Sequence, residues 1–152
     1  MEAIEPLWTF AADWKVRLVV LITIANMVLA VRLYTAMAKA RVRVVKAGKA
    51  TTETYRATQN EPEEAAVFNR AVMNQFESPT IFYALIAISL ALGVSSWLKV
   101  ILAALYVAIR WRHGYEMIGE HVVLRRRKLF VRSVQVLMAL MVEVALSALL
   151  WA

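Results

Sequence analysis

The chain has 152 residues, of which 61% are hydrophobic, with a mean hydropathy of +0.58, a formal net charge of +7 and no cysteine. Soluble domains are about 45–50% apolar, so this excess indicates a membrane protein if the apolar residues form stretches of about 20 residues each. The lack of cysteine excludes a disulfide framework, a cysteine nucleophile and a cysteine metal site. The sequence also has no phosphate-binding glycine loop and no paired-histidine motif, so we expect no metal site.

Apolar residues gather in long segments that alternate with polar ones. At a rise of about 1.5 Å per residue, a helix of about 22 residues covers the hydrocarbon core of a bilayer, which is about 30 Å thick. The segment 93–96 between two of these stretches reads as a tight turn and predicts an antiparallel helix hairpin. We therefore predict an all-α integral membrane protein with one domain, 1–152, built as a bundle of four transmembrane helices. The predicted spans are 16–38, 68–93, 96–118 and 129–151.

Positive charge in the connecting segments predicts the orientation, because cytoplasmic loops are rich in Lys and Arg. The segments 39–66 and 119–128 contain most of the basic residues, and four spans place both on the same side of the membrane. We expect both loops to be cytoplasmic and both termini to lie outside. Because the positive charge serves this topology and no basic soluble module is present, we do not expect nucleic-acid binding.

Polar residues occur within the predicted spans, where an ionisable side chain usually faces a partner or a cavity. Arg70, Asn74 and Glu77 stand at i, i+4 and i+7 and so share one helix face, and Arg110 and His113 share a face of the next span. One interpretation is mutual ion pairing, of Glu77 with Arg70 or Arg110, that holds the helices in register. The other is binding of an anionic guest, because guanidinium groups bind carboxylates with two parallel hydrogen bonds.

Three stretches together resemble a known family. The first stretch, 68–79, reads FNRAVMNQFESP and contains an Arg, an Asn four residues later and an acidic residue three residues after that. The second stretch, 106–113, reads YVAIRWRH and contains Arg-x-x-His. The third stretch, 123–130, includes Arg126 just before the last span. In this order they resemble the motifs of the MAPEG family, the membrane-associated proteins in eicosanoid and glutathione metabolism, and in particular its bacterial branch. The resemblance covers nearly the whole chain.

This resemblance implies a homotrimer in a bacterial cytoplasmic membrane, with glutathione bound between neighbouring protomers near the cytoplasmic side. It implies a glutathione transferase or peroxidase whose lipophilic small-molecule substrate enters from the membrane lipid. Arg126 would lie nearest the sulfur as the catalytic residue, because a nearby cation stabilises a thiolate. The residues that the resemblance assigns to glutathione binding are Arg41, Arg70, Asn74, Glu77, Arg110 and His113.

The match is weaker at the positions that would activate the thiol. Several members of the family have a tyrosine one turn after the helix-three histidine or early in the last helix, where this chain has Met117, Phe130 and Val131. Glu120 near the sulfur would oppose thiolate formation by like-charge repulsion. The alternative is therefore a non-enzymatic lipid-binding or scaffold subunit of the same fold. A transporter or channel is a third interpretation, which the absence of paired discontinuous helices disfavours.

Overall fold

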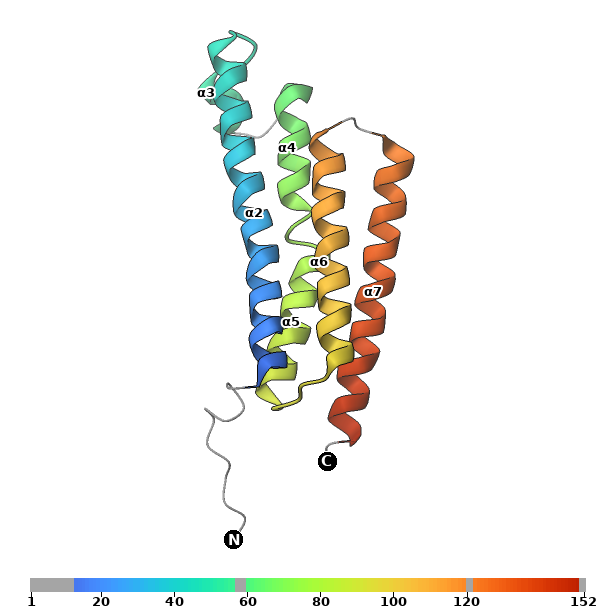
Figure 1. Ribbon diagram of the computed structural model, residues 1–152. Coiled ribbons are helices and arrows are strands. Elements are labelled where there is room, and N and C mark those ends of the chain that lie inside the picture. The colour runs from blue at the N-terminus through green and yellow to red at the C-terminus, as the bar shows by residue number, and fades with distance from the viewer. Residues whose placement is uncertain (1–12, 57–59, 120–121, 151–152) are drawn as a thin grey trace.

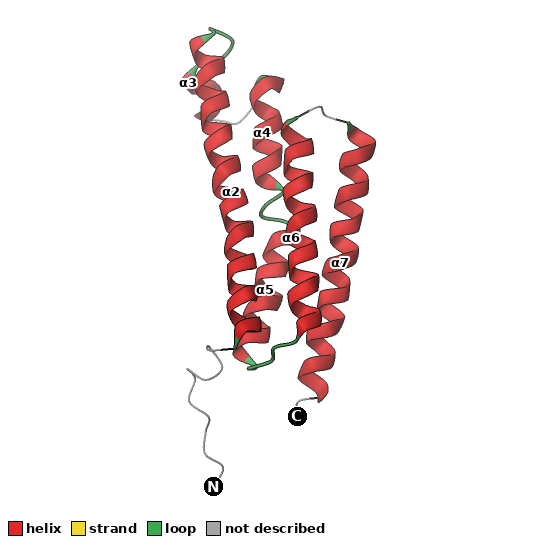
Figure 2. Ribbon diagram, viewed as in Figure 1, coloured by secondary structure: helices red, strands yellow, loops and turns green. Residues whose placement is uncertain are grey.

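The structure is a computed structural model that describes residues 13–56, 60–119 and 122–150. Figure 1 shows the long helices side by side, and Figure 2 shows that only short loops connect them. No strand occurs among these residues, which confirms the predicted all-α fold. The helices are α2 (Trp14–Lys46), α3 (Thr52–Arg56), α4 (Glu63–Met73), α5 (Ser78–Ala91), α6 (Trp97–Ile118) and α7 (Val123–Leu150).

Helix α2 is longer than the predicted span 16–38. Asp13 caps its start by accepting a hydrogen bond of 2.9 Å from the backbone N–H of Lys15. Its carboxylate also accepts a hydrogen bond of 2.7 Å from the Ser95 hydroxyl, and the two bonds lower the pKa of Asp13, that of Ser95 the more. The helix continues to Lys46 because Ala40 and Val44 are buried in a small core with Ala65 of α4. The basic residues expected in a loop here are therefore partly on a helix.

The predicted second span, 68–93, is not one continuous helix. It consists of α4 and α5, which are separated at residues 74–77. Pro79 lies in the first turn of α5, where its missing N–H is tolerated, whereas inside a continuous helix it would remove a hydrogen bond and clash with the preceding turn. The break places Asn74 at the C-terminus of α4 and Glu77 at the N-terminus of α5.

A short turn at 92–96 joins α5 to α6, and the two helices run in opposite directions as predicted (Figure 1). Gly93 has a φ of 67°, which glycine adopts without strain, and the Ser96 hydroxyl caps α6 by accepting from the Lys99 N–H at 3.0 Å. The main core includes Phe82 stacked on Tyr106, with ring centroids 4.7 Å apart. Helix α7 packs against α5 and α6.

Among the described residues, two helices, α2 and α7, are long and apolar enough to cross a membrane, and most of each apolar stretch lies exposed in the single chain. The predicted span 16–38 lies within α2, and residues 129–150 of the predicted span 129–151 lie within α7. The predicted spans 68–93 and 96–118 do not correspond to helices that are long and apolar enough to cross a membrane. The first is divided into α4 and α5, and the second, α6, contains several charged residues. The described residues of the segments 39–66 and 119–128 lie at one end of the molecule, and α2 begins and α7 ends at the other (Figure 1).

Candidate functional site

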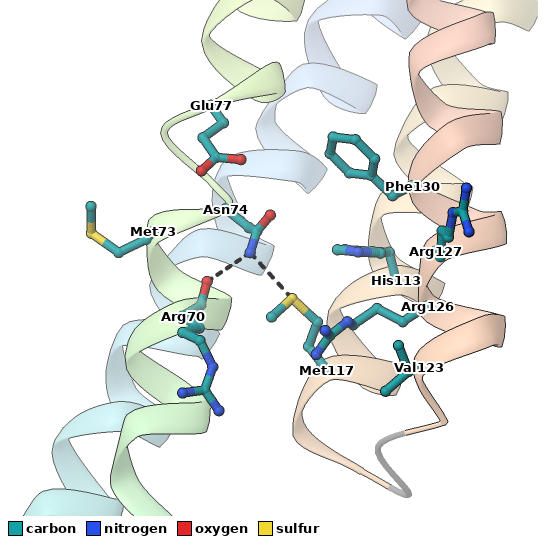
Figure 3. Close-up of a pocket in the computed structure, with 10 residues that line it drawn as sticks. All are labelled: Arg70, Met73, Asn74, Glu77, His113, Met117, Val123, Arg126, Arg127 and Phe130. Carbon is teal, nitrogen blue, oxygen red and sulfur yellow. Dashed lines mark hydrogen bonds between the residues drawn. The ribbon is translucent and has the colours of Figure 1, made fainter. Parts of the chain in front are cut away.

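A cavity of about 460 Å³ opens between α4, α6 and α7 near the basic end of the molecule. Figure 3 shows its side chains, which come from segments far apart in the sequence. Five predicted site residues line it: Arg70 on α4, Asn74 and Glu77 at the break between α4 and α5, His113 on α6 and Arg126 on α7. The residues that line it are Arg70, Met73, Asn74, Glu77, His113, Met117, Val123, Arg126, Arg127 and Phe130.

Asn74 lies at the centre of the α4 side of this cavity. Its Nδ2 donates to the backbone oxygen of Arg70 at 2.8 Å and to Sδ of Met117 at 3.4 Å, as Figure 3 shows. The Arg70 guanidinium forms an exposed ion pair with Glu63. It also lines a neighbouring cavity of about 620 Å³ that includes Glu63, so the two cavities meet at Arg70 and open toward the basic end. An anionic ligand could thus reach Arg70 from water.

Glu77 lies on the same side of the cavity as Asn74, at the start of α5, and Figure 3 shows its carboxylate close to the Asn74 side chain. This carboxylate forms no hydrogen bond and no ion pair with any other described residue. Arg70 pairs with Glu63 instead of Glu77, whereas the charges of Glu77 and Arg110 interact without a direct hydrogen bond between the two side chains. A free carboxylate on an open cavity is available for a cationic group of a ligand.

Arg110 does not line the cavity but lies directly behind it. It has no exposed surface, and its Nη2 donates to the backbone oxygen of Asn74 at 2.7 Å. This bond satisfies a carbonyl at the C-terminus of α4, where cations are favourable. Nε and Nη1 of Arg110 are buried and have no hydrogen-bond partner in the described residues. The guanidinium therefore holds the break between α4 and α5 while two of its donor groups are left unsatisfied.

His113 and the residues of α7 form the third side. His113 is 3% exposed, its Nδ1 has no hydrogen-bond partner among the described residues, and its ring lies 6.0 Å from that of Phe130. Arg126 extends from α7 toward Met117, whereas Arg127 lies beside α7 and away from Asn74 (Figure 3). The lining residues include no Tyr, Ser or Thr, so no side-chain hydroxyl in this lining can donate a hydrogen bond to a thiol. The arginines and the imidazole of His113 are the groups that could stabilise a thiolate there.

Arg41, like Arg110, is a predicted site residue that does not line this cavity. Its Nε donates to Glu61 at 2.8 Å, and its guanidinium lies 5.0 Å from the ring centroid of Tyr55. Glu61 also accepts from Asn69 at 3.2 Å, so these residues connect α2, α3 and α4. Within one chain Arg41 therefore stabilises the contact between helices.

The sequence analysis did not identify Arg127, Met73 and Val123 as lining residues. The predicted start of the last span at 129 left out Val123 and Arg127, because α7 already begins at Val123 and presents residues 123, 126, 127 and 130 in consecutive turns. Met73 is the last residue of α4, next to Asn74. Glu120, expected near the sulfur, lies outside the described residues. No group of three or more His, Cys, Asp or Glu side chains in the described part of the chain could hold a metal ion.

These features define an all-helical membrane protein with a polar cavity between its helices. The MAPEG family model matches residues 17–146, which span α2 to most of α7, so the chain belongs to the MAPEG family. Membership in this membrane family agrees with the two apolar helices and confirms the resemblance found in the sequence. No curated protein and no solved structure matches the chain significantly.

Proposed function

We propose that the chain binds glutathione in the cavity between α4, α6 and α7 and uses it as a glutathione transferase or peroxidase for lipophilic substrates. Family membership supports a glutathione- or eicosanoid-type function at the membrane. The observation that carries the proposal is the convergence on one cavity of Arg70, Asn74, Glu77, His113 and Arg126.

The chemistry of the lining residues fits this tripeptide, which has two carboxylates, an ammonium group and a thiol. Arg70 would hold a carboxylate at the open end, and the unpaired Glu77 would hold the ammonium group. The buried guanidinium of Arg110 lies behind the same cavity, where its positive charge would favour an anionic ligand. Bound glutathione would supply the sulfur nucleophile that the chain itself lacks.

Arg126 is the residue that we propose for the catalytic step. A guanidinium beside a thiol stabilises the thiolate and lowers the pKa of the thiol. Arg127 adds a second positive charge to the lining. The thiolate would then attack an electrophile, or reduce a hydroperoxide, that enters from the surrounding lipid.

A non-enzymatic lipid-binding or scaffold subunit is the second candidate function. One specific observation favours it, namely that Met117 and Phe130 line the cavity at positions where several family enzymes have a tyrosine. Without a hydroxyl donor in this lining, a thiol would depend on the arginines and His113 for activation.

We further propose that the protein spans a bacterial cytoplasmic membrane four times and assembles as a homotrimer. The 68–93 segment would cross as α4 followed by α5, because Arg110 satisfies the carbonyl at the break that lipid could not. A neighbouring protomer would then cover the open side of the cavity, and Arg41 would contribute to a site between protomers.

The decisive experiment measures glutathione binding to the detergent-purified protein by calorimetry. We expect Arg70→Ala and Glu77→Ala each to weaken binding by about tenfold or more, because each removes a charged contact worth roughly 1.5–3 kcal/mol. Arg56→Ala and Glu53→Ala are matched controls, since these residues form an exposed ion pair on α3, away from the cavity. Absent binding, or equal binding by all four variants, would refute the site.

A second measurement separates the enzyme from the scaffold. If Arg126 stabilises a thiolate, bound glutathione shows the ultraviolet absorbance of a thiolate at neutral pH, and Arg126→Ala abolishes this absorbance while retaining binding within a few-fold. No thiolate signal in the wild type, together with intact binding, would support the scaffold instead.

A further inference from the structure

The first turns of α7, which supply Arg126 to the candidate site, are held by little apolar packing within the chain. The first buried residue of α7 is Ser133, and every residue from 123 to 132 is exposed or half-buried. Phe130 contributes an aromatic contact with His113, at 6.0 Å between ring centroids. Because burial of apolar side chains is the main favourable contribution to packing, this end of α7 depends on polar contacts as well.

Glu116 of α6 makes such a contact. Its side chain is 7% exposed, and its Oε1 accepts a hydrogen bond of 3.3 Å from Nη1 of Arg125 in the first turn of α7. The same oxygen lies 3.1 Å from Nη2 of Arg112, one turn earlier on α6. A hydrogen bond between two charged groups is roughly twice as strong as one between neutral groups. Glu116 therefore connects the start of α7 to α6.

Glu116 and Arg125 are adjacent to residues that line the cavity, although neither lines it. On α6, Glu116 directly precedes Met117, and on α7, Arg125 directly precedes Arg126. Figure 3 shows the Arg126 side chain extending from α7 toward Met117. The interaction between two charges weakens as the distance between them increases, so a shift of the first turn of α7 would change the effect of Arg126 on a bound anion.

We propose that Glu116 is a positioning residue that acts through Arg125 to hold Arg126 beside the thiol of bound glutathione. This role rests on the proposed function, in which Arg126 stabilises the thiolate. The charge of Glu116 by itself disfavours a nearby thiolate, because like charges repel. Glu116 can therefore favour the thiolate only through the position of α7, and this difference in sign makes the two effects separable.

Titration of the thiolate absorbance of glutathione bound to the full-length protein in detergent measures the pKa of the thiol. We expect Glu116→Gln and Arg125→Gln each to raise this pKa by about one unit, which makes ionisation about tenfold less favourable, because Arg126 is no longer held beside the sulfur. Loss of charge alone would instead lower the pKa in Glu116→Gln and raise it in Arg125→Gln. Arg125→Lys keeps a cation opposite Glu116 and should retain a pKa close to that of the wild type.

Arg112→Gln is the matched control. Arg112 is the other partner of Glu116, is 63% exposed and does not line the cavity, so its replacement leaves the contact with α7 in place. The pKa of the bound thiol should stay at the wild-type value in this variant.

Hydrogen exchange of the protein without glutathione gives a readout that does not depend on the ligand. The backbone amides of residues 126–130 should exchange about tenfold faster in Glu116→Gln and Arg125→Gln, because the charged hydrogen bond that holds this segment is lost. In Arg112→Gln they should exchange at the wild-type rate.

The outcomes distinguish positioning from charge and from the failure of the site itself. A raised thiol pKa and faster exchange at the start of α7 in both test variants, but not in the control, support the proposal. A lowered pKa in Glu116→Gln, equal shifts in all three glutamine variants, or unchanged exchange at the start of α7 overturns it. If the wild type binds no glutathione, the proposed function and the role of Glu116 at the thiol both fail, whereas faster exchange in the two test variants would still show that Glu116 holds the start of α7.

Discussion

At the scale of single residues, the candidate site is notable for charged groups that lack partners. Glu77 lies free on the cavity, and Arg110 is buried with two unsatisfied donor groups. A buried polar group without a hydrogen bond costs roughly 1–3 kcal/mol, so such groups persist where a ligand completes them. The sequence predicted these residue types and their helix faces, but not that Arg110 would bind a backbone carbonyl.

The Arg110→Met variant distinguishes the effect of Arg110 on protein stability from its effect on glutathione binding. The variant keeps a similar side-chain volume and removes two unsatisfied donor groups, but it leaves the Asn74 carbonyl without its donor. Because each effect is worth about 1–3 kcal/mol and the two oppose one another, the free energy of unfolding should change little. Glutathione affinity should fall about tenfold, because the ligand loses a cation behind the cavity. Titration with sodium dodecyl sulfate and calorimetry measure the two effects, and a variant that loses stability and retains binding would contradict this account.

At the scale of elements, the end of the molecule opposite the cavity has its own polar cluster. Lys99 is 1% exposed and donates to the backbone oxygen of Val94 at 2.7 Å, and its Nζ lies 3.8 Å from the Glu143 carboxylate. Glu143 also accepts hydrogen bonds from Ser96 and Ser147. The cluster therefore joins the start of α6 to the end of α7. These partners come from different helices, so spacing along the sequence does not identify them.

A double-mutant cycle on this pair tests its role. Lys99→Met alone should destabilise the protein by about 3–5 kcal/mol, because it leaves the Glu143 carboxylate buried and unpaired. Lys99→Met/Glu143→Leu should recover most of this loss, since apolar side chains replace both charges. The free energy of unfolding of the wild type, the two single variants and the double variant is measured by detergent titration. If the loss in the double variant equals the sum of the two single losses, Lys99 and Glu143 are not coupled. Glutathione binding should remain intact in the double variant.

At the scale of the whole molecule, the basic residues gather at one end and the apolar stretches of α2 and α7 extend toward the other. Positive charge on one side of a membrane protein predicts its orientation. The structure places residues 39–56 and the start of α7 at the same end, which the predicted topology requires. The cations lie on helix ends rather than in loops, because α2 and α7 both extend beyond the predicted spans.

The lack of native cysteine makes the topology directly measurable, because each engineered thiol is unique. We expect Thr52→Cys in α3 to react with a membrane-impermeant maleimide only in inverted vesicles, and Leu92→Cys at the end of α5 to react only in right-side-out vesicles. Both residues are exposed in the chain. Labelling of both positions from the same side would contradict four spans, whatever the result for glutathione.

The sequence by itself determined the helical membrane class, the family and most of the site residues, because composition, helical periodicity and motif spacing are local properties of the chain. It placed Arg70, Asn74 and Glu77 on one side and Arg126 near them. The tertiary structure alone decided how distant segments meet. Arg110 packs under the α4–α5 break, Arg41 pairs with Glu61 instead of entering the cavity of its own chain, and the early start of α7 creates the third wall. These outcomes depend on which side chains pack together in three dimensions, and spacing along one segment contains no information about its partners.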